Sequence, residues 1–215
     1  MPARIVQIVS GSEPRRRTRG AIFALALAAC GTLSACGPAP QAAAGASGAA
    51  QASNGPGGPF QLVNQDGKAV DQSVLNGKWS IVFFGYTFCP DFCPTTLTNL
   101  GQAMQILGPT AAKTQVVFVS VDPARDTPAE LKTYLSAKVF PKNIMGLTGT
   151  PAQVAQAAKD YMVYYQKDGS GPNYTVDHST ALYVMDPKGQ YKGVIAEGLT
   201  PAQQAQQIQA DISGA

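Results

Sequence analysis

The feature that most constrains the fold is a short apolar run that leads directly into a pair of cysteines. Residues 80–85 are almost all apolar, as expected of a strand that is buried on both faces of a sheet. Cys89 and Cys93 follow, and apolar residues then recur at helical spacing as far as Leu107. The pattern predicts a buried strand that passes into a helix, with both cysteines near the junction.

The rest of the chain alternates strand and helix patterns. A second buried strand is predicted at residues 115–121, and turn signals predict hairpins at residues 60–70 and 181–196. A strand that ends in a cysteine pair within such an α/β plan predicts a thioredoxin-like fold. We expect a central mixed sheet flanked by helices, with an added N-terminal β-hairpin.

Three later helices are predicted from a Thr-Pro pair, in which the threonine hydroxyl caps the helix and proline occupies its first turn. The capping residues are Thr127, Thr150 and Thr200. A helical run is also expected to carry three tyrosines in ordinary packing, namely Tyr161, Tyr164 and Tyr165.

Residues 1–35 resemble a lipoprotein-type signal peptide. Several arginines precede an apolar stretch at residues 21–29, which is too short to span a bilayer. Lipobox-like sequences end at Cys30 and at Cys36. Cleavage before Cys36 leaves one pair of cysteines in the remaining chain, so Cys36 is the predicted lipidation site. The alternative is an ordinary cleaved leader.

The predicted linker is residues 36–59. After Cys36 it contains only alanine, glycine, serine, proline, glutamine and asparagine, with no charge and no large apolar side chain. Such a composition predicts a flexible linker, because it buries too little surface to offset the entropy of ordering its backbone. The folded, thioredoxin-like domain is predicted at residues 60–215. Together these features predict an exported, membrane-anchored lipoprotein that faces the periplasm or the cell exterior.

The net charge of +3 comes from the leader. Five of the 16 lysines and arginines precede residue 36, and the rest of the chain carries 11 basic and 12 acidic residues. A nucleic-acid-binding domain carries a basic surplus on its folded part. We therefore expect no nucleic acid among the partners.

The spacing of the cysteine pair leaves three roles open. Cys89 and Cys93 are four residues apart, which places them one turn apart on one face of a helix. Free N–H groups at a helix N-terminus favour the thiolate form. The pair could bind a soft metal such as Cu(I) or zinc, could act as a redox dithiol, or could form a structural disulfide.

His178 favours the metal. It is the only histidine, and it precedes the strand predicted at residues 181–185. In a thioredoxin-like sheet the loop that enters this strand lies beside the start of the cysteine-bearing helix. Two thiolates and one imidazole suit trigonal Cu(I), and they hold Cu(II) with an added water or carboxylate. Structural zinc prefers four closed ligands, so copper is favoured. Asp177 either orients the imidazole ring or is a solvated loop residue.

Asp122 and Arg125 follow the second strand, at the edge where sites collect in α/β sheets. They could pair with each other or contact a partner. The alternative is that they fix the loop before the helix at Thr127.

Three sequence blocks together resemble the Sco/SenC family. They are GYTFCPDFCP at residues 85–94, SVDPARDTP at residues 120–128, and VDHS at residues 176–179 followed by YVMDPKG. The blocks occur in the family's order. The resemblance implies a thioredoxin-like fold, a membrane-tethered domain outside the cytoplasm, and copper bound by the two cysteines and the histidine. Some relatives carry a transmembrane helix where this chain has a lipobox.

The resemblance also implies a copper metallochaperone for assembly of the copper A centre of cytochrome c oxidase. Reduced Cys89 and Cys93 would capture copper, His178 would complete the site, and a Cys89–Cys93 disulfide would release or block the ion. The expected partners are the copper A subunit, other periplasmic copper chaperones and thioredoxin-like reductants. The alternative is a membrane-anchored thiol–disulfide oxidoreductase in which Cys89 attacks, Cys93 resolves and His178 is dispensable. A copper-responsive sensor would use the same site.

Overall fold

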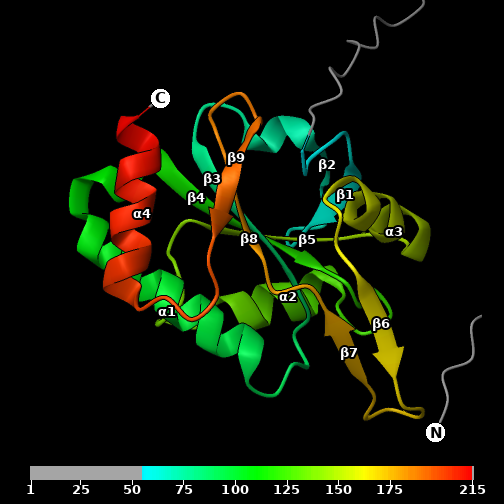
Figure 1. Ribbon diagram of the computed structural model, residues 1–215. Coiled ribbons are helices and arrows are strands. Elements are labelled where there is room, and N and C mark those ends of the chain that lie inside the picture. Colours follow the sequence, from blue (N-terminus) through cyan, green and yellow to red (C-terminus); the bar gives the residue numbers. More distant parts are fainter. Residues whose placement is uncertain (1–54, 215) are drawn as a thin grey trace, which may run out of the picture. The chain divides into compact units, whose positions relative to one another are not determined.

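The computed structural model describes residues 55–214 of the chain (Figure 1). Seven strands form one mixed sheet in the order β2-β1-β5-β4-β3-β8-β9, and β6 and β7 form a separate hairpin. The predicted signal peptide, Cys36 and most of the predicted linker lie outside the described residues. At the end of that linker, the Gly57 N–H donates to the Asp160 carbonyl over 2.9 Å.

The strands are β1 (Gln61–Asn64), β2 (Ala69–Asp71), β3 (Trp79–Gly85), β4 (Thr114–Ser120), β5 (Ile144–Thr148), β6 (Tyr165–Asp168), β7 (Thr175–His178), β8 (Leu182–Met185) and β9 (Tyr191–Ile195). The α-helices are α1 (Phe92–Leu107), α2 (Pro128–Leu135), α3 (Pro151–Asp160) and α4 (Pro201–Ser213), and two 3₁₀ helices are η1 (Gln72–Leu75) and η2 (Gly108–Lys113).

Helices cover both faces of the sheet, as the apolar central strands require. β3, β4 and β5 run parallel to one another. β1 and β8 run in the opposite direction, and the outer strands β2 and β9 are antiparallel to β1 and β8, respectively. On one face, Phe83 contacts Phe92 of α1 and Phe118, and α4 packs on α1. On the other face, Phe84 contacts Tyr161, which directly follows α3. The predicted thioredoxin-like α/β class is confirmed, with the N-terminal hairpin formed by β1 and β2.

The predicted helix starts are confirmed because the signal for each is local. Thr127, Thr150 and Thr200 each accept a hydrogen bond from the backbone N–H three residues later. At Thr150 and Thr200 a glutamine side chain also contacts the backbone N–H of the cap, which completes a capping box.

The tyrosine run was predicted wrongly as helical. α3 ends at Asp160, and Met162 adopts a left-handed conformation with φ of 56°, which a helix cannot continue through. Tyr161 is buried in ordinary packing, as expected, whereas Tyr164 is 60% exposed and Tyr165 begins β6. The hairpin of β6 and β7 was not predicted, because β6 is polar and mostly exposed and its pairing partner lies several residues away. β5 was also missed.

Candidate metal centre

The two cysteines lie where β3 passes into α1, as predicted. Cys89 is half-buried in the connecting loop, and Cys93 is fully buried in the first turn of α1. The Cys93 backbone N–H donates to Cys89 Sγ over 3.3 Å. Both cysteines are free thiols in this structure.

Gly85, the last residue of β3, leaves space for the buried sulfur. A Cβ atom at this position would lie 2.9 Å from Cys93 Sγ and 2.8 Å from Cε2 of Phe118. Both distances are shorter than side chains normally tolerate, so any larger residue would displace the sulfur or the ring. A glycine at the end of this strand is therefore part of the site.

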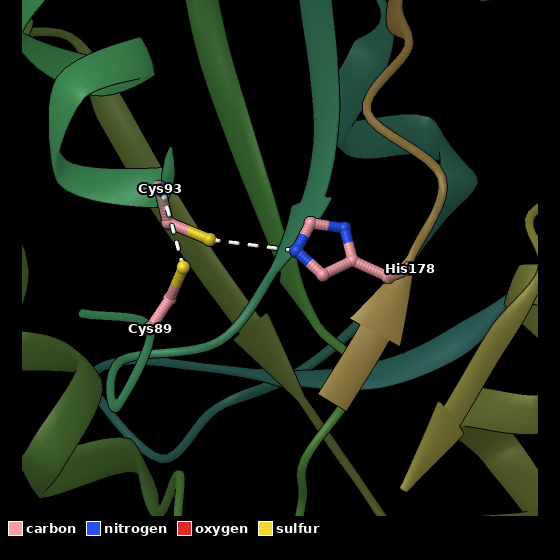
Figure 2. A group of neighbouring side chains, drawn as sticks. All are labelled: Cys89, Cys93 and His178. Carbon is pink, nitrogen blue, oxygen red and sulfur yellow. Dashed lines mark hydrogen bonds between the residues drawn. The ribbon is translucent and has the colours of Figure 1, made fainter. Parts of the chain in front are cut away.

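His178 is the last residue of β7, and its ring points at the cysteines (Figure 2). The Nε2 atom lies 3.6 Å from Cys93 Sγ, and Nδ1 lies 2.9 Å from the Ser179 carbonyl oxygen. A carbonyl oxygen can only accept, so Nδ1 donates to it and Nε2 is the ring nitrogen that faces the sulfur. With Nδ1 used in this way, Nε2 is the nitrogen left to bind a metal.

Three aromatic rings surround the imidazole. Phe83, Tyr86 and Phe92 contact it edge to face, with ring centroids 5.9–6.3 Å away. They hold the ring orientation and exclude water from one side of the site. These three rings were not predicted as part of the site, although Tyr86 and Phe92 lie inside the cysteine motif and Phe83 in the strand before it.

The side-chain atoms of Cys89, Cys93 and His178 can hold a metal ion. One ligand atom from each residue lies within 4.8 Å of the other two. The chemistry of this set, with two sulfurs and one imidazole nitrogen, favours a soft or borderline ion over magnesium or calcium. The juxtaposition of all three predicted ligands is therefore present in the fold.

The two thiols differ in acidity. A hydrogen bond from the Cys93 thiol is the main reason why the pKa of Cys89 is lowered to about 5, and backbone N–H groups of Cys93 and Asp91 add to it. The pKa of Cys93 is raised, because its proton is held by Cys89 and because burial disfavours its charged form. Cys89 is thus the thiolate of the reduced pair near neutral pH.

Arg125 links the cysteine loop to the β6–β7 hairpin. Its guanidinium lies 3.5 Å from the ring centroid of Tyr174 and 4.6 Å from that of Phe88. It also donates to the carbonyl oxygens of Pro172 and Tyr174 at the base of β7. Through these contacts, the segment that carries His178 is held against the loop that carries Cys89.

Asp122 pairs with Arg125, which is one of the two arrangements predicted for them. The Arg125 Nε–Asp122 Oδ2 distance is 2.5 Å, and the Tyr174 hydroxyl donates to the other oxygen of Asp122. Both side chains are largely buried, so the pair serves to fix the guanidinium. The pair also lies in the loop before α2, which agrees with the loop-fixing role.

Asp126 holds the loop before the cysteines, a role that was not predicted from the sequence. It is fully buried and accepts hydrogen bonds from the Ser120 hydroxyl and from both the hydroxyl and the N–H of Thr87. Burial raises its pKa.

Asp177, which was predicted either to orient the imidazole or to be solvated, is exposed. It alternates with His178 along β7, so the two side chains point to opposite faces. The acceptor at the ring is the Ser179 carbonyl instead.

The chain is similar in sequence to known proteins. The SCO1/SenC family model matches residues 48–213. The chain belongs to the SCO1/SenC family. It is 45% identical over 139 residues to the mitochondrial protein SCO1 of Saccharomyces cerevisiae, a match that covers 63% of this chain and 46% of that one. It is 45% identical over 133 residues to SenC of Rhodobacter capsulatus, covering 61% and 59% of the two chains.

A solved structure of a relative in the SCO1/SenC family contains a metal. The copper-bound structure of Bradyrhizobium japonicum ScoI aligns with a TM-score of 0.66 at 42% identity, over 72% of this chain and 98% of that one. The chain spans about half the length of the curated relatives it matches. Within residues 55–214, no helix combines the length and apolar character that a bilayer span requires.

Proposed function

We propose that this SCO1/SenC protein binds one copper ion through Cys89, Cys93 and His178. The observation that carries the proposal is the mutual distance of the three ligand atoms, which is within 4.8 Å, while Nδ1 of His178 contacts the Ser179 carbonyl and Nε2 faces the sulfur of Cys93. Two sulfurs and one nitrogen suit trigonal Cu(I), and an added water or carboxylate would complete a site for Cu(II). The similarity to copper-bound ScoI supports copper as the ion.

The copper is cargo for assembly of the copper A centre of cytochrome c oxidase. Cys89 is half-buried at the mouth of the site, so thiolates of the copper A subunit can replace it in a stepwise ligand exchange. Transfer of two electrons from the thiolates to a disulfide-bearing partner would form a Cys89–Cys93 disulfide. That step removes two of the three ligands and releases the ion.

The site operates outside the cytoplasm on a lipid-anchored chain. The support is the lipobox at Cys36, the signal sequence before it and the uncharged linker at residues 36–59. Mass spectrometry of the mature protein is expected to find a diacylglyceryl-modified Cys36 at the N-terminus. An unmodified N-terminus beyond residue 36 would contradict the anchor without affecting the copper site.

The ligand assignment is tested by anaerobic Cu(I) titration of the reduced protein. Wild type is expected to bind one equivalent, with X-ray absorption reporting two sulfur and one nitrogen neighbours. Cys89→Ser and His178→Ala are each expected to lose stoichiometric binding while their circular dichroism spectra stay unchanged. Asp177→Ala is the matched control, because this neighbour of His178 is exposed and faces away. Unchanged binding in His178→Ala defeats the assignment.

A second function, thiol–disulfide reduction of partner cysteines, is favoured by the unequal thiols. Cys89 combines partial exposure with a lowered pKa, which suits an attacking thiolate, and buried Cys93 suits the resolving role. Attack on a partner disulfide forms a mixed disulfide, and Cys93 then displaces the partner as a reduced dithiol. A thioredoxin-like reductant must restore the Cys89–Cys93 pair.

The His178→Ala variant separates the two functions. If the protein acts as a reductase, this variant is expected to reduce the disulfide of a copper A subunit peptide at a similar rate to wild type, while its copper binding is lost. If His178→Ala loses both activities, the separate reductase function is rejected, and only the copper function remains.

A further inference from the structure

Four exposed lysines form a row along one edge of the sheet. Lys142 precedes β5, Lys113 precedes β4, Lys78 precedes β3, and Lys188 lies in the turn between β8 and β9. These four strands are neighbours in the order β5-β4-β3-β8. Because adjacent strands are about 4.8 Å apart, the row extends over roughly 15 Å. We call these four residues the lysine row.

Acidic residues gather at the opposite edge, with the metal centre. They lie in segments that follow the carboxyl ends of β3, β4 and β9. The exposed ones are Asp91, Glu130 and Glu197. At the edge of the lysine row, Asp186 is mostly buried and accepts the Lys188 N–H, and its remaining oxygen faces Lys192 at 3.7 Å. Asp66, which lies near Lys142, is paired with Lys132. Within residues 55–214 none of the four lysines of the row forms an ion pair, so the row carries unpaired positive charge.

The chain enters the described part of the fold at the edge of the lysine row. Gly55 lies against the ring of Tyr191, the first residue of β9, just after the turn that carries Lys188. A Cβ atom on Gly57 would lie 2.9 Å from Cε of Met185, the last residue of β8. The predicted lipidation site therefore connects to the fold on the same side as the lysines, and not on the side of the metal centre.

We propose that the lysine row binds the anionic phospholipid headgroups of a membrane, so that the metal centre points away from the bilayer. Cys36 precedes Gly55 by 19 residues, and such a segment spans at most about 65 Å when fully extended. A tether of this length permits several orientations of the domain. The positive edge selects one of them, because a lysine within a Debye length of an anionic surface raises partitioning about fivefold.

This orientation of the domain is independent of the proposed copper function, but it determines which proteins can reach the copper site. A copper site held at the far edge faces proteins that project from the same membrane, rather than the lipid surface. The acidic residues around the site would be repelled by anionic headgroups, so charge at both edges favours the same orientation.

The test is sedimentation of the mature chain, which begins at residue 36 and lacks the arginine-rich leader, with vesicles. Cys36→Ser is introduced so that no acyl chain contributes to binding. Vesicles of phosphatidylglycerol mixed with phosphatidylcholine are compared with pure phosphatidylcholine. The chain is expected to prefer the anionic vesicles, and the preference is expected to disappear in about 1 M NaCl, where the Debye length is about 3 Å.

Substitution of the row distinguishes its charge from that of the whole molecule. The quadruple variant with Lys78→Gln, Lys113→Gln, Lys142→Gln and Lys188→Gln is expected to lose more than about tenfold in partitioning onto anionic vesicles. The corresponding four Lys→Arg changes keep the charge and are expected to retain binding. Lys167→Gln, on the hairpin beside the metal centre, is expected to have little effect.

Equal partitioning of the quadruple Lys→Gln variant and wild type overturns the proposal, as does equal binding to anionic and neutral vesicles. Loss of binding in the quadruple Lys→Arg variant also overturns it, because the charge is then not the determinant. Cu(I) stoichiometry is measured on the same proteins. It is expected to remain at one equivalent, so failure of membrane binding is distinguishable from failure of the copper site.

Discussion

At the scale of residues, the two sulfurs carry different reactivity because their hydrogen bonds run in opposite directions. Cys89 accepts from the thiol and the N–H of Cys93, whereas the Cys93 thiol gives up its hydrogen bond on ionisation.

The first prediction concerns alkylation of the reduced, metal-free protein by iodoacetamide. Above a pH of about 6 the rate at Cys89 is expected to be nearly constant, because its pKa is lowered to about 5. Below that pKa the rate is expected to fall about tenfold per pH unit, as the thiolate is protonated.

The measurement is mass spectrometry of peptides after timed alkylation between pH 4 and pH 9. Cys93→Ala is the informative variant, since alanine has no donor to replace the thiol that stabilises the Cys89 thiolate, and it is expected to raise the apparent pKa. A rate for Cys89 that keeps rising up to pH 8.5 in wild type would contradict the assignment.

Gly85 provides the second prediction at this scale. Gly85→Ala places a methyl group within 3 Å of both Cys93 Sγ and the Phe118 ring, so one of them must move. We expect a loss of about 1–3 kcal/mol in the free energy of unfolding, as in other overpacked cores. We also expect weaker copper binding, measured by competition with a chromophoric Cu(I) chelator. Gly193→Ala is the matched control, because no other side chain lies within 4 Å of a Cβ atom there. Similar behaviour of the two variants would exclude close packing as the role of Gly85.

At the scale of elements, the β6–β7 hairpin brings the third ligand to the site, and it does so without belonging to the main sheet. Its attachment depends on side chains. Arg125 is the main one, with its guanidinium between Tyr174 and Phe88 and its N–H groups on two hairpin carbonyls. The hairpin can therefore loosen without unfolding of the sheet, which would withdraw His178 from the cysteines.

Arg125→Ala tests this attachment. Amide hydrogen exchange over residues 165–178 is expected to become faster, and copper affinity is expected to fall about tenfold, a typical effect of losing support for a ligand. Arg125→Lys is expected to restore little of either, because an ammonium lacks the planar set of donors. Lys132→Ala is the control, since it removes only an exposed ion pair with Asp66. Unchanged exchange in Arg125→Ala would show that other contacts hold the hairpin.

At the scale of the whole molecule, the copper site joins segments that are far apart in the chain, so binding is coupled to folding. Cys93 and His178 are 85 residues apart, and the unfolded chain has no preformed site. Free copper at about 100 times its dissociation constant is expected to stabilise the folded state by about 2.7 kcal/mol. For a domain of this size the Tm is then expected to rise by about 5–10 °C.

Thermal unfolding followed by circular dichroism, under anaerobic reducing conditions, measures this shift. His178→Ala is expected to show a much smaller shift at the same copper concentration, because it lacks the ligand from the hairpin. An equal shift in this variant would mean that copper stabilises the fold through some other set of residues.

The sequence by itself determined the local elements and the identity of the candidate ligands. The threonine caps at Thr127, Thr150 and Thr200 depend on contacts within a few residues, and they were predicted correctly for that reason. The buried run at β3 and the cysteine spacing predicted the strand–helix junction, because the apolar pattern of a strand or helix can be recognised within a short segment. The resemblance in three sequence blocks indicated the family.

Only the tertiary structure decided how the third ligand reaches the first two. The hairpin that carries His178 has a polar strand, Tyr165–Asp168, with no periodic signal, and it exists because it pairs with β7 and is clamped by Arg125. The tautomer of His178 is set by the Ser179 carbonyl, and the space for Cys93 is set by Gly85 and Phe118. These are distances between segments that are remote along the chain. A sequence pattern encodes the propensities of a segment, whereas such distances arise when the segments pack together.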